Sequence, residues 1–295
     1  MYFHYWLFTS KVANLDVSLY AEDNIKRFML YNILQDVLGF NSTGGPLGFR
    51  VKFFFGTWYN LLVPGTISCP LIPGIPAKRN ILQSLGFVAY LYFLVAALRT
   101  NTPLGFNDLA PVVGVLAVLT PFDFVPFQAS RGEHSGYMLV CMLFPWSGSA
   151  LHGMRLCQAF LWSWAGMAKM GPWMKYVNAF MMPNSKLMPL LALIGVPVQK
   201  LLYKDPTASK GKKDVNPSGF LAFVAQFAVV FEISLGPMCL FAPAIGVPIA
   251  TVFHLYILSM TPFASVMEWN CNCLYLVHAL FNSASTSPYF GYVSQ

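Results

Sequence analysis

The chain consists of long runs of apolar residues separated by short polar or Pro- and Gly-rich segments. A helix needs about 20 mostly apolar residues to cross the hydrocarbon core of a membrane. Three runs meet this requirement clearly, at 81–98, 219–241 and 247–265, and five are less clean, at 25–40, 109–126, 136–151, 152–170 and 266–281. The pattern therefore predicts an all-α integral membrane protein, a polytopic bundle of about eight transmembrane helices with Pro/Gly-rich interfacial loops.

Two apolar or Pro-rich segments are not expected to cross. Non-helical backbone cannot face lipid, so the Pro- and Gly-rich residues 64–76 are expected to lie at the interface or against protein, tucked under the bundle. Residues 187–203 are apolar but contain Pro189, Pro197 and Lys200. They are therefore predicted to lie on the membrane surface or to re-enter it.

The sequence indicates a single domain, 1–295, because no internal repeat and no second domain are visible. Residues 41–48 are typical of a turn, and residues 203–217 form the one plausible hydrophilic linker, a Lys-rich polar loop. The sequon Asn41-Ser42-Thr43 is interpreted as a chance match.

The composition excludes several classes of protein. Apolar residues make up 56% of the chain and charged residues 10%, whereas a soluble domain carries about 25% charged residues. So few charges cannot coat a globule of this size. A soluble globular protein, a disordered chain and a disulfide-stapled secreted module are therefore excluded.

The net charge of +7 predicts membrane orientation rather than nucleic-acid binding. The basic residues form no stripe interleaved with aromatics, so no nucleic-acid partner is expected. With residues 25–40 as the first span and 187–203 not crossing, twelve Lys and Arg share one side and five the other. The positive-inside rule then places the Lys-rich loop on the matrix, stromal or cytoplasmic side of a mitochondrial or thylakoid inner membrane or a bacterial plasma membrane. The densest basic run is Lys200, Lys204, Lys210, Lys212 and Lys213.

The six cysteines predict no metal site. They include no CxxC pair and no histidines at zinc spacing, and Cys271 and Cys273 would face different directions on a helix. All six are interpreted as small core residues.

Ionisable residues inside apolar runs are functional candidates, because a charge at membrane depth costs a few kcal/mol. Four stand out: Lys169, Glu232, His254 and Glu268. A helical hairpin would bring Glu232 and His254 to similar depth. One interpretation is a buried acid–base or ligand-binding cluster with Lys169 as base or counter-ion; the other is a structural Lys169–Glu232 pair, with His254 and Glu268 bonding backbone or capping helices.

No cofactor is required by these residues. Glu232, His254 or His278 could ligate a chlorophyll or haem, although a membrane histidine is more often hydrogen-bonded core. A bound lipid, quinone or pigment stays an open alternative. Arg131-Gly132-Glu133-His134 is a charged turn that either pairs internally or binds a headgroup, and Asp123 is expected to cap a helix or be hydrated.

Several blocks of the chain resemble a known family. SRGEHSGYMLVCMLF at 130–144, FMMPN at 180–184 and MEWN at 267–270 are similar to the uncharacterised multi-pass membrane proteins grouped as domain of unknown function 3556. The likeness covers most of the chain in order. It implies a transmembrane fold and no assigned activity, and it suggests that family sequence is missing at both ends.

A weaker likeness involves WAGMAKMGPW at 164–173 and the polar positions that follow it. This block resembles the horizontally transferred transmembrane domain of vitamin-K-dependent carboxylase-like proteins. The resemblance implies that Lys169 matches a motif lysine, with Glu232 and His254 as the other polar positions. The chain lacks the large lumenal domain of those enzymes.

Two functions follow from these observations. The first is a non-catalytic accessory subunit that packs against membrane lipids and other membrane subunits in a respiratory or photosynthetic complex. The second is a membrane-embedded enzyme or lipid/quinone-binding protein using Lys169, Glu232 and His254. A transporter is disfavoured because no inverted repeat is visible.

Overall fold

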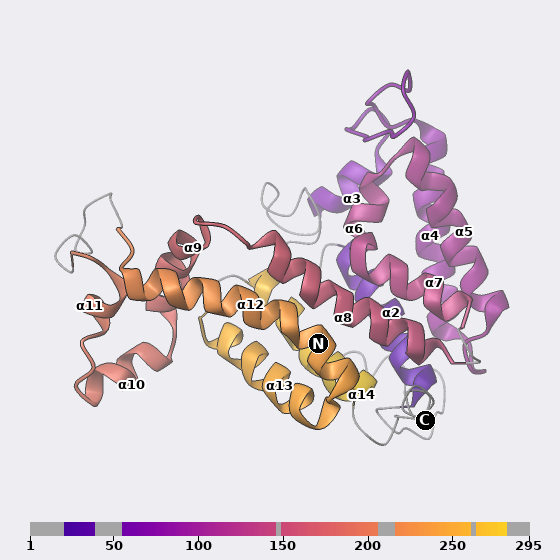
Figure 1. Cartoon of the computed structure of the whole chain (residues 1–295). Coiled ribbons are helices and arrows are strands. Elements are labelled where there is room, and N and C mark those ends of the chain that lie inside the picture. The colour runs from indigo at the N-terminus through magenta and orange to yellow at the C-terminus, as the bar shows by residue number, and fades with distance from the viewer. Residues whose placement is uncertain (1–20, 39–54, 146–148, 206–215, 261–263, 282–295) are drawn as a thin grey trace. The chain divides into compact units, whose positions relative to one another are not determined.

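A computed structural model describes residues 21–38, 55–145, 149–205, 216–260 and 264–281 (Figure 1). The predicted turn at 41–48 and the loop lysines Lys210, Lys212 and Lys213 lie outside these residues. Within them the regular structure is helical, with two isolated β-bridges, so the prediction of an all-α fold is confirmed.

The helices follow one another in the order α2 (Glu22–Val37), α3 (Phe55–Leu62), α4 (Ile81–Arg99), α5 (Phe106–Phe122), α6 (Val125–Ala129), the π-helix η1 (Gly132–Gly136), α7 (Tyr137–Leu143), α8 (Ala150–Ala168), α9 (Met174–Met181), the 3-10 helix η2 (Met182–Asn184), α10 (Leu187–Leu193), α11 (Val198–Leu202), α12 (Gly219–Phe241), α13 (Pro243–Met260) and α14 (Ala264–Phe281). The chain divides into two compact units, Met1–Cys157 and Gln158–Gln295, which are described separately. The single domain predicted from the sequence stays a prediction.

Three helices of the described chain are long and apolar enough to cross a membrane: α4, α12 and α13. They correspond to the three clearest runs of the sequence, except that α13 begins at Pro243 and ends at Met260, so the predicted run 247–265 started and ended too late. The count of eight spans is not confirmed. α2 has only 16 residues and carries both acidic and basic side chains, and the run 136–151 is interrupted where α7 ends at Leu143.

In the first unit, α4 and α5 form an antiparallel pair. α4 begins with a capping box. The Asn80 side chain accepts a hydrogen bond from the Gln83 backbone N–H, and the Gln83 side chain accepts one from the Asn80 backbone N–H. The Gln83 side chain also donates to the Phe122 carbonyl at 2.7 Å, which joins the start of α4 to the end of α5. α2 packs against α4 and α7.

The Pro- and Gly-rich loop ahead of α4 is hydrogen-bonded to the end of α5, but most of its residues are exposed, so it is not tucked under the described part of the first unit. Its Ile67–Lys78 bridge closes the loop, and Gly65 and Gly74 adopt the positive φ angles that favour glycine. The Leu71 N–H donates to the Pro121 carbonyl at the end of α5, and the Cys69 carbonyl accepts from Phe124 N–H. Several backbone groups of this irregular segment therefore find partners within the chain.

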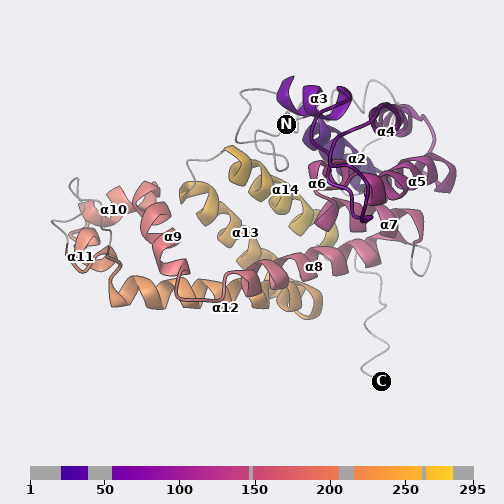
Figure 2. The same ribbon diagram turned by 90° about the horizontal axis from the view of Figure 1, so that it is seen from above.

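In the second unit, α8 and α12 run antiparallel at close range. A Cβ on Gly236 would lie 2.3 Å from the Ala159 carbonyl oxygen, and one on Gly166 would lie 2.7 Å from the Ile233 side chain. The Ser163 hydroxyl donates to the Ile233 carbonyl at 3.0 Å. Small residues thus let the two backbones approach, as is common between membrane helices. α13 folds back on α12 and packs against α14 (Figure 2).

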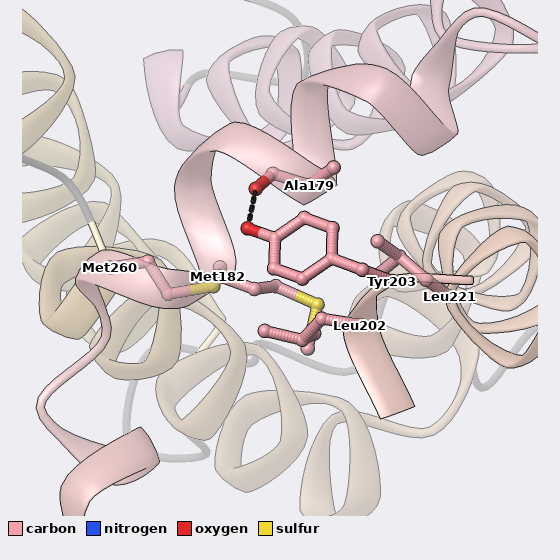
Figure 3. Close-up of a cluster of buried hydrophobic side chains, with 6 residues drawn as sticks. All are labelled: Ala179, Met182, Leu202, Tyr203, Leu221 and Met260. Atoms are coloured by element: carbon pink, nitrogen blue, oxygen red, sulfur yellow. Dashed lines mark hydrogen bonds between the residues drawn. The ribbon is translucent and has the colours of Figure 1, made fainter. Parts of the chain in front are cut away.

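A small core joins α9, η2 and α11 to the ends of α12 and α13 (Figure 3). Its buried residues are Ala179, Met182, Leu202, Tyr203, Leu221 and Met260. The Tyr203 hydroxyl donates to the Ala179 carbonyl at 3.0 Å. α10 and α11 have seven and five residues, too few to cross, in line with the surface or re-entrant position predicted for 187–203.

Candidate functional site

The second unit brings Lys169 and Glu232 together. Lys169 directly follows α8, and Glu232 lies in the middle of α12. The Lys169 Nζ donates to both carboxylate oxygens of Glu232 at 2.6 Å, and the Glu232 side chain is buried while that of Lys169 is 34% exposed. The close packing of α8 on α12 positions this pair. Each charge is thereby neutralised by the other within the apolar part of the chain.

His254 of α13 lies in a separate hydrogen-bonded group. The Trp162 indole N–H donates to His254 Nε2 at 3.0 Å, and His254 Nδ1 lies 2.6 Å from the Asn270 Oδ1. An indole can only donate, so Nε2 is the unprotonated nitrogen and Nδ1 carries the proton that Asn270 accepts. Both ring nitrogens of the buried, neutral imidazole are engaged. No lone pair is left on this ring for a haem iron or a chlorophyll magnesium.

His278 is engaged through its Nε2 atom. The Thr251 hydroxyl donates its proton to the Val247 carbonyl, so the contact of 3.1 Å between Thr251 Oγ1 and His278 Nε2 requires the histidine to be the donor. A protonated Nε2 cannot ligate a metal, and in the neutral ring the lone pair is then on Nδ1. Glu268 lies early in α14, and its side chain is outside the described part of the chain.

The candidate residues therefore form two contacts rather than one cluster. Lys169 pairs with α12, whereas His254 is held by Trp162 of α8 and Asn270 of α14. Trp162 and Lys169 are seven residues apart in the chain, about 10 Å along a helix axis. Among the described residues, no group of three His, Cys, Asp or Glu side chains could hold a metal ion.

The first unit contains buried ion pairs that the sequence did not suggest. Arg79 and Asp123 have side chains 0% and 1% exposed, and Arg79 Nε donates to Asp123 Oδ2 at 2.9 Å. Asp123 also accepts from the backbone N–H groups of Cys69 and Val125. The expectation that Asp123 caps a helix or is hydrated is thus incomplete: it accepts at the start of α6, but its main partner is a buried guanidinium.

The first turns of α2 connect it to other helices. Arg27 is fully buried and donates to Asp23, to the Leu98 carbonyl and to the Thr102 carbonyl. Asp23 in turn accepts from the Leu104 N–H at 2.6 Å. The signal in the sequence was the acidic–basic pairing four residues apart at the start of the run 25–40.

The charged turn at 131–134 lies at an unusual backbone feature. Arg131 has φ 50° and ψ 51°, in the left-handed region, and the π-helix η1 follows it directly. Its Nε donates to Asp36 of α2 at 3.0 Å, so the turn pairs internally. A Cβ on Gly132 would lie 2.4 Å from the Phe127 ring, which explains the glycine. π-helices and left-handed non-glycine residues concentrate at functional sites.

The described residues of the first unit line at least two hollows. One of about 250 Å³ is apolar and lined by α5, α6 and α7 residues, including Leu116, Phe127 and Leu139. The other, of about 310 Å³, is more polar and lies where α4 ends and α5 begins, lined among others by Tyr92, Arg99 and Asp108. Neither includes a candidate residue of the second unit.

Comparison with known proteins agrees with the sequence resemblance. The family model described as "Transmembrane protein of unknown function (DUF3556)" matches residues 17–292, which cover most of both compact units. No curated protein and no solved structure matches the chain. The likeness to carboxylase-like transmembrane domains gains no support from these comparisons.

Proposed function

The chain belongs to the family of transmembrane proteins of unknown function (DUF3556), and from this premise we propose that it is a non-catalytic accessory subunit of a larger membrane complex. The complex would be of the respiratory or photosynthetic type. Other membrane subunits and lipids would then be its partners.

The observation that carries the proposal is a row of phenylalanine rings along α12. Phe223, Phe227 and Phe231 follow one another at intervals of one helical turn, with centroid distances of 6.4 and 6.1 Å. Phe223 is 68% and Phe227 61% exposed. Helices associate in membranes through van der Waals packing, and stacked aromatic rings offer a large surface of fixed shape. Such a row suits a helix of a neighbouring subunit.

The polar groups of the second unit support a structural role as well. The Lys169–Glu232 pair neutralises two charges, and the His254 ring has donor and acceptor engaged. A general base needs a lone pair that substrate can reach. The lone pairs of Glu232 and His254 are instead engaged in hydrogen bonds that connect α8, α12, α13 and α14.

The alternative is a membrane-embedded enzyme or lipid/quinone-binding protein that uses Lys169, Glu232 and His254. Its support is the exposure of about a third of the Lys169 side chain, which lets an acidic or carbonyl group approach the pair. In this function Lys169 would exchange Glu232 for the bound molecule.

We also infer the membrane topology beyond the three helices. α8 and α14 have 19 and 18 residues, the length needed to cross, and the count of about eight spans stays a prediction. The excess of Lys and Arg on one side supports a Lys-rich loop facing the matrix, stroma or cytoplasm.

The test is the size of the particle that contains the chain. The full chain is extracted from its native membrane in mild detergent and run on a native gel, with cross-linking and mass spectrometry of the neighbours. The wild type and Phe160→Ala, which removes an exposed phenylalanine outside the row, should migrate with a large complex. Phe223→Ala/Phe227→Ala should release the chain as a smaller species. A wild-type chain that migrates alone would disprove the accessory role.

The same preparation distinguishes the alternative. A chain that migrates alone and retains one quinone or lipid per molecule, lost in Lys169→Met and kept in Lys175→Met, would favour the binding protein. Lys175 is the control because it lies on α9 and has no ion pair with a carboxylate in the described chain.

A further inference from the structure

Two of the six cysteines face each other in the first unit. Cys141 of α7 and Cys157 of α8 have sulfur atoms 3.6 Å apart. A disulfide has a sulfur–sulfur distance of about 2.05 Å, so the two thiols lie within about 1.5 Å of bonding distance. Both residues are half-buried, so part of each side chain lies at the surface of this unit. The interpretation of all six cysteines as core residues is therefore insufficient for this pair, and it is wrong for Cys69, which is exposed.

A glycine in α8 brings the two helices into this contact. A Cβ on Gly153 would lie 2.7 Å from Cys141 Sγ and 2.8 Å from Cys141 Cβ, closer than real side chains approach. Cys157 is four residues further along α8 and so lies on the same face as Gly153. Cys141 thus rests on the glycine with its sulfur directed at Cys157. The helix packing, rather than a flexible loop, holds the thiols together.

We propose that Cys141 and Cys157 are a redox modification site that closes to an intramolecular disulfide. The co-reactant is a small-molecule disulfide of the oxidised-glutathione type. One cysteine thiolate attacks it, forms a mixed disulfide and releases one glutathione thiol; the second thiolate then displaces the other glutathione. Overall the two cysteines lose two protons and two electrons, and the glutathione disulfide gains them as two thiols. The proposed disulfide would link α7 covalently to α8. This proposal is independent of the proposed accessory function.

The chain offers a direct readout of this bond. Membranes that contain the full chain are treated with oxidised glutathione, remaining thiols are blocked with N-ethylmaleimide, and the denatured protein is digested with trypsin. Cleavage after Arg131, Arg155 and Lys169 places the two cysteines in separate peptides, 132–155 and 156–169, each with one cysteine. The expected product is these two peptides linked, two hydrogens lighter than their sum, and separated by dithiothreitol.

Variants test whether the helix contact is the cause. Cys141→Ser and Cys157→Ser should each abolish the linked peptide, and Cys239→Ser, in the second unit, should leave it unchanged. Gly153→Ala should lower its yield several-fold, whereas Gly114→Ala, where an added Cβ meets nothing within 4 Å, should not. Both peptides carrying N-ethylmaleimide after oxidation, or a lasting glutathione adduct on Cys141 of the wild type, would overturn the proposal. Because the linked peptide is measured in the wild-type chain, the test remains valid even if one of the variants does not fold.

Discussion

The pair formed by Arg79 and Asp123 places two charges in a fully buried position at the start of α4. Asp123 accepts four hydrogen bonds, two from the guanidinium of Arg79 and two from backbone N–H groups. Such a pair is costly to desolvate, and its stability depends on both partners being present. It holds the Pro- and Gly-rich loop against the end of α5.

Removing one partner of this pair should destabilise the first unit strongly. Asp123→Asn leaves the Arg79 charge buried without a counter-ion, and the free energy of unfolding should fall by about 3–5 kcal/mol. Thermal unfolding in detergent micelles measures this loss. Arg99→Met, at the exposed end of α4, should change the unfolding free energy by less than about 0.5 kcal/mol. The double variant Arg79→Met/Asp123→Leu should recover much of the loss, and an Asp123→Asn chain as stable as the wild type would contradict the argument.

The candidate residues of the second unit show what the sequence leaves undecided at the scale of single residues. Lys169, Glu232 and His254 could be chosen as candidates because ions are rare in apolar runs. Which partner each one takes depends on residues far along the chain, such as Asn270 for His254 and Asp36 for Arg131. Spacing along one helix cannot supply contacts that only tertiary packing creates.

At the scale of elements, Glu22 joins two helix starts. It lies ahead of the predicted span 25–40, in the first turn of α2, and accepts from the Ser149 hydroxyl at 2.7 Å and the Ala150 N–H of α8 at 3.1 Å. Burial raises the pKa of Glu22, but the hydrogen bonds of Lys26, Ser149 and Ala150 outweigh it and hold the pKa below its usual 4.5. The folded chain therefore prefers the carboxylate form.

This preference gives a pH-dependent stability. Because the folded pKa is below the unfolded one, the contribution of Glu22 is present above pH 4.5 and is lost as the pH falls through the folded pKa. Glu22→Gln should therefore lower the unfolding free energy by about 1 kcal/mol at pH 7, and the difference from the wild type should shrink in acid. Unfolding temperatures of both proteins between pH 7 and pH 3 measure this.

A matched control is the exposed Glu133 in η1. Glu133→Gln should leave the unfolding temperature close to that of the wild type at neutral pH. A difference between Glu22→Gln and the wild type that stays constant into acid would show that the charge of Glu22 is not responsible.

Element boundaries were predicted less well than element type, for local reasons. The run 136–151 is apolar throughout, but α7 ends at Leu143, just ahead of Pro145. A residue before proline is pushed out of the helical region, so the proline should have divided this run. The left-handed Arg131 and the π-helix after it had no comparable signal, because they depend on Gly132 packing under Phe127.

At the scale of the whole molecule, composition was sufficient to predict the class. The apolar windows of α4, α12 and α13 are only 39%, 33% and 22% buried within the chain, so most of their surface must be covered by lipid or by other proteins. The number of spans could not be derived in the same way. A helix such as α8 has the length to cross, but His152, Arg155 and Gln158 interrupt its apolar surface.

The short helix α10 gives a way to locate the membrane surface on this molecule. It follows η2 at the end of the α12–α13 hairpin, where the Lys186 N–H donates to the Ser259 carbonyl at 3.1 Å. Seven residues span about 10 Å, so α10 cannot cross, but Leu193 is 82% exposed and Leu190 is exposed as well. An apolar helix face at this end of the α12–α13 hairpin is expected to enter the boundary between headgroups and acyl chains.

Cysteine labelling tests this position. In a chain whose native cysteines are replaced by serine, Leu193→Cys in native membranes should react with a water-soluble maleimide several-fold more slowly than Lys204→Cys. Lys204 is the control because it is exposed, polar and close to the same end of α12. A nitroxide attached to Leu193→Cys should be relaxed by oxygen, which concentrates in lipid, more than by a water-soluble nickel complex. Equal labelling of both cysteines would instead place α10 in water, and the membrane boundary would then have to lie closer to the middle of α12 and α13.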